Sequence, residues 1–80
     1  MNELTLKALL LDTIMYLNHG HHMAPNYKAA KKAFCRAIGQ PENIPAKQLL
    51  HGIGLVYRDN GKEAEFWRVI DKFNLSDLFA

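Results

Sequence analysis

The histidines are the residues whose clustering in this sequence could indicate a metal site. His19, His21 and His22 lie in one short stretch, and His51 stands apart. Imidazole is a common metal ligand, but adjacent histidine side chains tend to diverge, and the sequence has neither a His-Glu-x-x-His spacing nor an acidic residue near the cluster. We therefore expect no metal site. The cluster is interpreted as a solvated loop, with a shared change of charge near pH 6–6.5 as the alternative.

Cys35 is the only cysteine and the only candidate nucleophile that the sequence singles out. Neighbouring Lys31, Lys32 and Arg36 would lower the pKa of its thiol, and a histidine base would then activate it. The plainer interpretation is a small, partly buried side chain that fills space. We adopt the plainer interpretation.

The remaining patterns do not predict catalysis either. Glu63 and Glu65 are two residues apart and would point to different sides of a helix. Gly52-x-Gly54 lacks the lysine and the third glycine of a phosphate-binding loop. The sequence therefore predicts a protein that is not an enzyme and that holds no cofactor.

Basic residues give the strongest functional signal. Residues 26–51 contain four lysines and one arginine against a single acid, Glu42, whereas both flanking parts of the chain are slightly acidic. On a helix over 27–38 most of these cations would share one face, which suits an acidic partner. The predicted partner-binding residues are Lys28, Lys31, Lys32, Arg36 and Lys47.

The helices that would position this basic face are predicted from the chain length and from the glycine and proline residues that separate helical segments. The chain has 80 residues, of which 49% are hydrophobic and 22% charged, so it forms one domain over 1–80 and is too short for a barrel or doubly wound enzyme. Glycine and proline signals separate four helical segments, 2–19, 27–38, 46–57 and 62–73, and Ser76 begins a short final turn. The predicted fold is a compact all-α four-helix domain with a C-terminal helical turn.

An alternative concerns residues 55–70. Asp59-Asn60-Gly61 also suits a β-hairpin, and three helices followed by such a wing have the element order of a winged-helix DNA-binding regulator. Lys-Glu-Ala-Glu at 62–65 favours the helix instead. Acidic residues on or beside the wing would also repel phosphates. The seven-residue loop 39–45 is too long for a tight helix-turn-helix.

The first helix is apolar on nearly every side. We expect Leu4, Leu11 and Met15 to face the core and the remaining face to be covered by a second copy, giving a possible homodimer through residues 4–17. That remaining face consists of Leu6, Leu10, Ile14 and Leu17. In the fourth segment, Trp67 is expected in the core.

Location follows from cysteine usage and hydropathy. A lone thiol suits the reducing cytoplasm, and the chain does not start with the basic region of a secretory signal. The most apolar run, Leu9–Leu11, is far shorter than the roughly 20 residues of a membrane span. We expect a non-enzymatic cytoplasmic interaction module, an adaptor, inhibitor or regulator, whose partner is an acidic protein. The alternative is the DNA-binding regulator.

Overall fold

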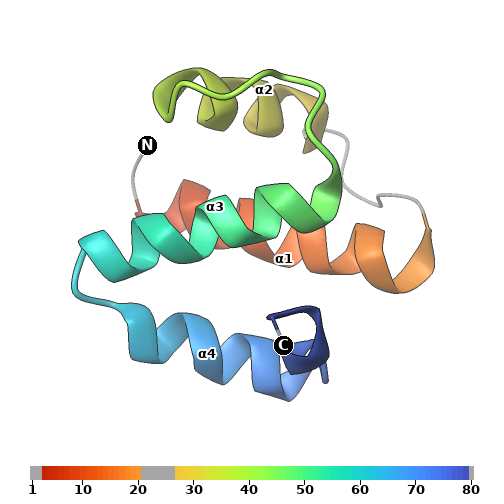
Figure 1. The fold of residues 1–80 in the computed structure, drawn as a ribbon, viewed down its shortest axis with the longest axis vertical. Helices are drawn as coiled ribbons and strands as arrows, with labels where there is room; N and C mark the ends of the chain where they lie inside the picture. Colours follow the sequence, from red (N-terminus) through yellow and green to blue (C-terminus); the bar gives the residue numbers. More distant parts are fainter. Residues whose placement is uncertain (1–2, 21–26, 80) are drawn as a thin grey trace.

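Four α-helices and a short 3-10 helix make up the part of the chain that the structure describes (Figure 1). The computed structural model describes residues 3–20 and 27–79, with side chains from residue 5 onward. The elements are α1 (Glu3–His19), α2 (Tyr27–Ala37), α3 (Ala46–Asp59), α4 (Glu63–Lys72) and the 3-10 helix Ser76–Phe79. The predicted all-α four-helix fold with a short C-terminal turn is confirmed.

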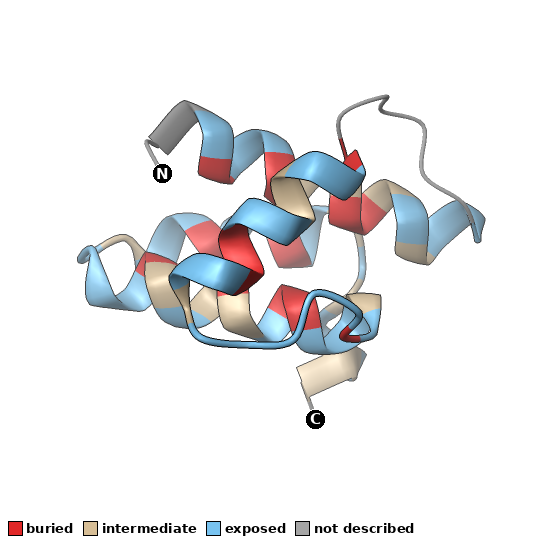
Figure 2. Cartoon of the chain, turned by 90° about the horizontal axis from the view of Figure 1, so that it is seen from above, coloured by how far each residue is buried: buried red, intermediate tan, exposed pale blue. Residues whose placement is uncertain are grey.

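Helix α3 is the central element. It packs against α1 and α4, while α2 packs on α1. In Figure 1, α2 and α4 lie on opposite sides of α3, and the chain runs in opposite directions along α3 and α4. Buried positions face the space between the helices (Figure 2). None of the described helices combines the length and the apolar character that crossing a membrane needs.

Asn60-Gly61 ends a helix and does not form a hairpin turn. Gly61 has a φ of 74°, but Asn60 has a φ of −88°, whereas a type I′ turn needs a positive φ at both positions. Lys62 N–H donates to the Tyr57 carbonyl and Gly61 N–H to the Arg58 carbonyl, which is the Schellman pattern of a helix C-terminus. The alternative wing over 55–70 is therefore wrong, and no strand occurs in the described part of the chain.

The core face of α1 differs from the predicted one. Leu6, Leu10 and Ile14, which we expected to await a second copy, are buried within the chain itself. Leu11 and Met15, which we expected inward, are only half-buried. The physical reason is that both α2 and α3 pack on α1, so its buried arc is wide. Three of the four residues of the face predicted to meet a second copy are therefore part of the chain's own core, while the homodimer through residues 4–17 itself stays a prediction.

The two glycines of α3 allow neighbouring side chains to approach closely. A Cβ atom built on Gly54 would lie 2.9 Å from ring atoms of Phe66, a buried residue of α4. A Cβ atom on Gly52 would lie 3.3 Å from Ile38 Cδ1, just beyond the end of α2. Gly52 and Gly54 thus leave room for Ile38 and Phe66 to pack closely against α3.

Trp67 is not a core residue. Its side chain is 37% exposed, while Phe66 and Ile70, four residues apart, are the buried positions of α4. Successive side chains on a helix point about 100° apart, so Trp67 lies at the edge of the core when Phe66 points into it. There its indole N–H donates to Glu63 Oε1 at 3.2 Å and its ring packs edge-on against Phe79.

Candidate functional site

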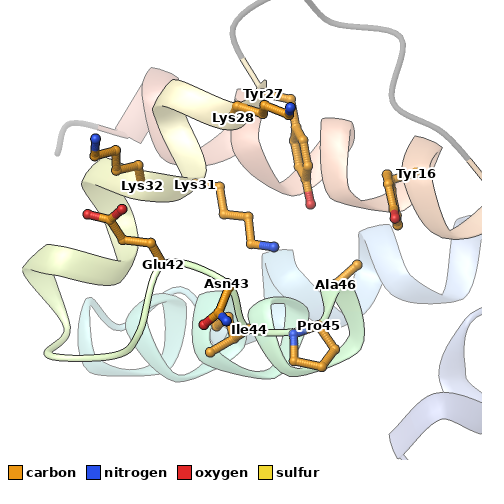
Figure 3. Close-up of a pocket in the computed structure, with 10 residues that line it drawn as sticks. All are labelled: Tyr16, Tyr27, Lys28, Lys31, Lys32, Glu42, Asn43, Ile44, Pro45 and Ala46. Carbon is orange, nitrogen blue, oxygen red and sulfur yellow. The ribbon is translucent and has the colours of Figure 1, made fainter.

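A groove of about 520 Å³ lies beside the basic face of α2. Its walls come from α2, from the C-terminal half of α1, and from the segment that leads into α3 (Figure 3). Ten residues line the groove, of which three are lysines and one is acidic. The lining residues are Tyr16, Tyr27, Lys28, Lys31, Lys32, Glu42, Asn43, Ile44, Pro45 and Ala46.

Helical periodicity places the lysines at the groove. Tyr27, Phe34 and Cys35 are the buried residues of α2, so they fix which side of the helix faces the core. Lys28 and Lys32 then fall beside that face and are exposed, whereas Lys31 falls between the directions of Phe34 and Cys35 and is half-buried. Figure 3 shows Lys31 extending from α2 into the groove, toward the start of α3. These three residues of the predicted site are brought together.

The other two predicted cations lie outside the groove lining. Arg36 Nε is 2.7 Å from Glu42 Oε1, so the loop after α2 supplies its own acid to that end of the basic face. Both side chains are largely exposed, and such a pair contributes about 0–1 kcal/mol. Lys47 is exposed in the first turn of α3.

The backbone adds to the positive potential. A helix N-terminus carries a partial positive charge, which an acidic residue in the first turn would offset. The first turns of α2 and α3 contain no acidic residue and contain Lys28 and Lys47 instead. Tyr27, which starts α2, and Ala46, which starts α3, both line the groove. The groove is therefore a place where negative charge is favoured.

Aromatic rings form one end of the groove. Tyr16 stacks on Tyr27, with ring centroids 5.8 Å apart and planes inclined by 13°. Tyr27 is buried, as its helical position predicts, whereas Tyr16 is 37% exposed. Sequence reasoning missed Tyr16, since only the fold shows that this part of α1 reaches α2. Tyr57 does not line this groove and is buried against Phe66.

A second basic groove, of about 350 Å³, lies between α1 and α4. Lys7, Arg68 and Lys72 line it together with Glu65 and Tyr57. Burial, with the nearby Glu65 carboxylate, raises the pKa of the Tyr57 hydroxyl. Sequence reasoning did not find this cluster because Lys7 is far from the other two cations along the chain. It provides a matched reference for experiments on the first groove.

Cys35 is fully buried on the core side of α2. Burial raises the pKa of its thiol, and the charge of Lys31 opposes this only in part. The thiolate needed for nucleophilic attack is therefore disfavoured. The structure supports the interpretation of Cys35 as a side chain that fills space.

The histidines do not converge in the described part of the chain. His19 lies at the end of α1, and His51 lies on the outer side of α3, where it stacks on Phe79. His21 and His22 are outside the described residues. Among the residues that the structure does describe, no three His, Cys, Asp or Glu side chains are grouped as metal ligands would be.

Comparison of the chain with models of protein families, with curated proteins and with solved structures gave no match, so any function must be argued from the groove's own geometry.

Proposed function

We propose that this protein is a non-enzymatic interaction module that docks an acidic partner protein in the groove beside α2. The observation that carries the proposal is the convergence of Lys28, Lys31 and Lys32 on one groove that has Glu42 as the only acid among its lining residues. An adaptor, inhibitor or regulator acts through such a contact. The lone buried thiol, Cys35, suits a reducing cytoplasm, where we place the protein.

In the free protein, repulsion between the cations of the groove lowers the stability of α2. Lys28 and Lys32 are four residues apart on α2, and like charges at this spacing destabilise a helix by about 0.2–0.5 kcal/mol. Lys28 also sits at the positive end of the helix dipole. Carboxylates of a partner would relieve these repulsions, so binding would gain more here than at a surface of mixed charge.

A protein partner is favoured over nucleic acid. The net charge is only +2, which is small for a protein that follows an extended phosphate backbone. The predicted wing of the DNA-binding alternative is replaced by α4. A short acidic protein segment fits the limited extent of the basic face.

The test compares two double charge reversals. Lys28→Glu with Lys32→Glu reverses the groove, and Arg68→Glu with Lys72→Glu makes the same change of net charge at the second basic groove. All four side chains are exposed, so each change should cost within about 0.5 kcal/mol of stability. Binding of labelled poly-glutamate and of a DNA duplex is measured by fluorescence anisotropy at low and high salt.

Poly-glutamate should bind the unmodified protein and the Arg68/Lys72 variant similarly, and the Lys28/Lys32 variant at least about tenfold more weakly. Binding should weaken with salt, because the contact is between charges. Affinity capture with the same three proteins then identifies the natural partner as the species lost only with Lys28/Lys32. Equal losses in both variants, or tighter binding of the duplex than of poly-glutamate, would contradict the proposal.

A further inference from the structure

The groove beside α2 has an apolar end that its lysines do not explain. Figure 3 shows Tyr16 at one end of the groove and Lys32 at the other. Pro45 and Ala46 also line the groove, at the start of α3. Tyr16 and Pro45 are both exposed to solvent. An apolar side chain of a partner would be removed from water against these surfaces, so the groove suits more than a string of carboxylates.

The lysines beside this apolar end are available to a partner. Glu42, the only acid among the lining residues, is 2.7 Å from Arg36 Nε. Among the described residues, none of the three groove lysines takes part in an ion pair. The Lys31 side chain reaches across the groove toward the start of α3 (Figure 3). A carboxylate bound to Lys31 would therefore hold the neighbouring side chains of its own segment near the apolar end.

We propose that the acidic segment that docks in this groove also carries an aromatic side chain, which packs on Tyr16 and the start of α3. This inference rests on the docking function proposed above and specifies its partner further. The Tyr16 ring stacks on Tyr27 and is still 37% exposed, so a ring of the partner can extend an existing aromatic pair. An aromatic side chain also supplies a large contact area for little loss of conformational freedom.

Neither acidic nor apolar side chains alone would fit the whole groove. A purely acidic segment would place carboxylates against Tyr16 and Pro45, where they would lose water and gain no opposite charge. A purely apolar segment would cover Lys31, which is already half-buried, without giving its ammonium a partner. A segment with one aromatic side chain among carboxylates meets both requirements.

Short labelled peptides test this by fluorescence anisotropy with the unmodified protein. The probes are hexaglutamate and two derivatives in which one central glutamate is replaced by phenylalanine or by alanine, so that both derivatives have the same charge. The phenylalanine peptide should bind at least about fivefold more tightly than the alanine peptide. This ratio should persist at high salt, because salt screens the contacts between charges but not the apolar contact.

Substitutions at Tyr16 locate the aromatic contact. Tyr16→Ala should reduce the preference for phenylalanine to less than about twofold and leave the binding of hexaglutamate nearly unchanged, whereas Tyr16→Phe should retain the preference. Trp67→Ala is the matched control, because Trp67 is also 37% exposed and does not line the groove. It should retain the preference too. Circular dichroism checks that each variant is folded, and the comparison of peptides on the unmodified protein does not depend on any variant.

The two proposals fail in different ways. Hexaglutamate binding that is unaffected by Lys28→Glu with Lys32→Glu would contradict the docking function itself. If hexaglutamate binds through these lysines but phenylalanine and alanine peptides bind equally, only the aromatic partner is overturned. A preference for phenylalanine that survives Tyr16→Ala, or that is lost equally in Trp67→Ala, would also overturn it.

Discussion

Gly54→Ala tests the packing between α3 and α4 directly. The added Cβ atom would lie 2.9 Å from Cε2 and Cζ of Phe66, closer than carbon atoms of neighbouring side chains normally approach. The Phe66 ring cannot easily move, because it is 1% exposed and lies among the rings of Tyr57, Trp67 and Phe79. Either the ring or the backbone of α4 must shift.

Two opposing effects set the magnitude. Alanine is favoured over glycine in a helix by about 1 kcal/mol, and overpacking a core costs about 1–3 kcal/mol. We expect Gly54→Ala to lower the free energy of unfolding by about 0–2 kcal/mol in total. Gly52→Ala is the matched control. Its Cβ would meet Ile38 Cδ1, the end of a half-buried flexible side chain, at 3.3 Å, so much of the helix gain should survive there.

The two variants are compared by urea unfolding, followed by circular dichroism and by Trp67 fluorescence. Gly54→Ala should be about 1–2 kcal/mol less stable than Gly52→Ala, which corresponds to a Tm lower by several degrees in a domain of this size. Phe66→Leu removes the ring that the new methyl group meets, so it should cost less in the Gly54→Ala background than alone. Equal stability of the two alanine variants would refute the close approach of Phe66 to α3.

Two further predictions concern single side chains. Trp67→Ala should lower the free energy of unfolding by about 1–2 kcal/mol, below the roughly 3–5 kcal/mol of a fully buried tryptophan, because Trp67 is 37% exposed. A variant that is already unfolded before heating, and so gives no cooperative thermal melt, would contradict this. Cys35 should react with a thiol reagent at pH 8 about 100-fold more slowly than after unfolding in urea, because burial raises its pKa and blocks access; equal rates would contradict this.

The helices could be predicted from local signals, because their ends depend on local chemistry. Gly39 and Gly61 have φ angles of 72° and 74°, which glycine adopts without strain, so glycine marked two helix ends correctly. Asn60-Gly61 was ambiguous because a hairpin turn and a helix end both need a positive φ at the glycine. The conformation of Asn60 distinguishes them, and it depends on whether residues 62–65 continue as a helix.

Burial within the helices depended on neighbours that the sequence does not specify. Helix α1 is apolar on several sides, so periodicity alone did not show that Leu9 would be buried and Met15 only half-buried. Trp67 and Phe66 are adjacent aromatics, and only the position of α3 selects Phe66 for the core. In both cases the predicted face was wrong because the direction of a packing partner is a tertiary property.

The basic face could be predicted from the sequence only where its residues lie on one helix. Lys28, Lys31 and Lys32 were predicted from the periodicity of α2, and they do line one groove. The pairing of Arg36 with Glu42 depends on how the loop returns toward α2, and the contribution of Tyr16 depends on α1. Neither is encoded in the spacing of charges along α2.

Helix α3 links the packing of the core to the groove proposed as the docking site. Its buried residues pack in the core, and its two glycines admit Ile38 on one flank and Phe66 on the other. Leu55 lies between the two glycines' flanks and the solvent and is 51% exposed. The start of the same helix, at Ala46, borders the basic groove. A larger residue at Gly54 should therefore disturb the surface around Leu55 before it affects the groove lysines, since Gly54, Leu55 and Phe66 all line one small hollow of about 190 Å³.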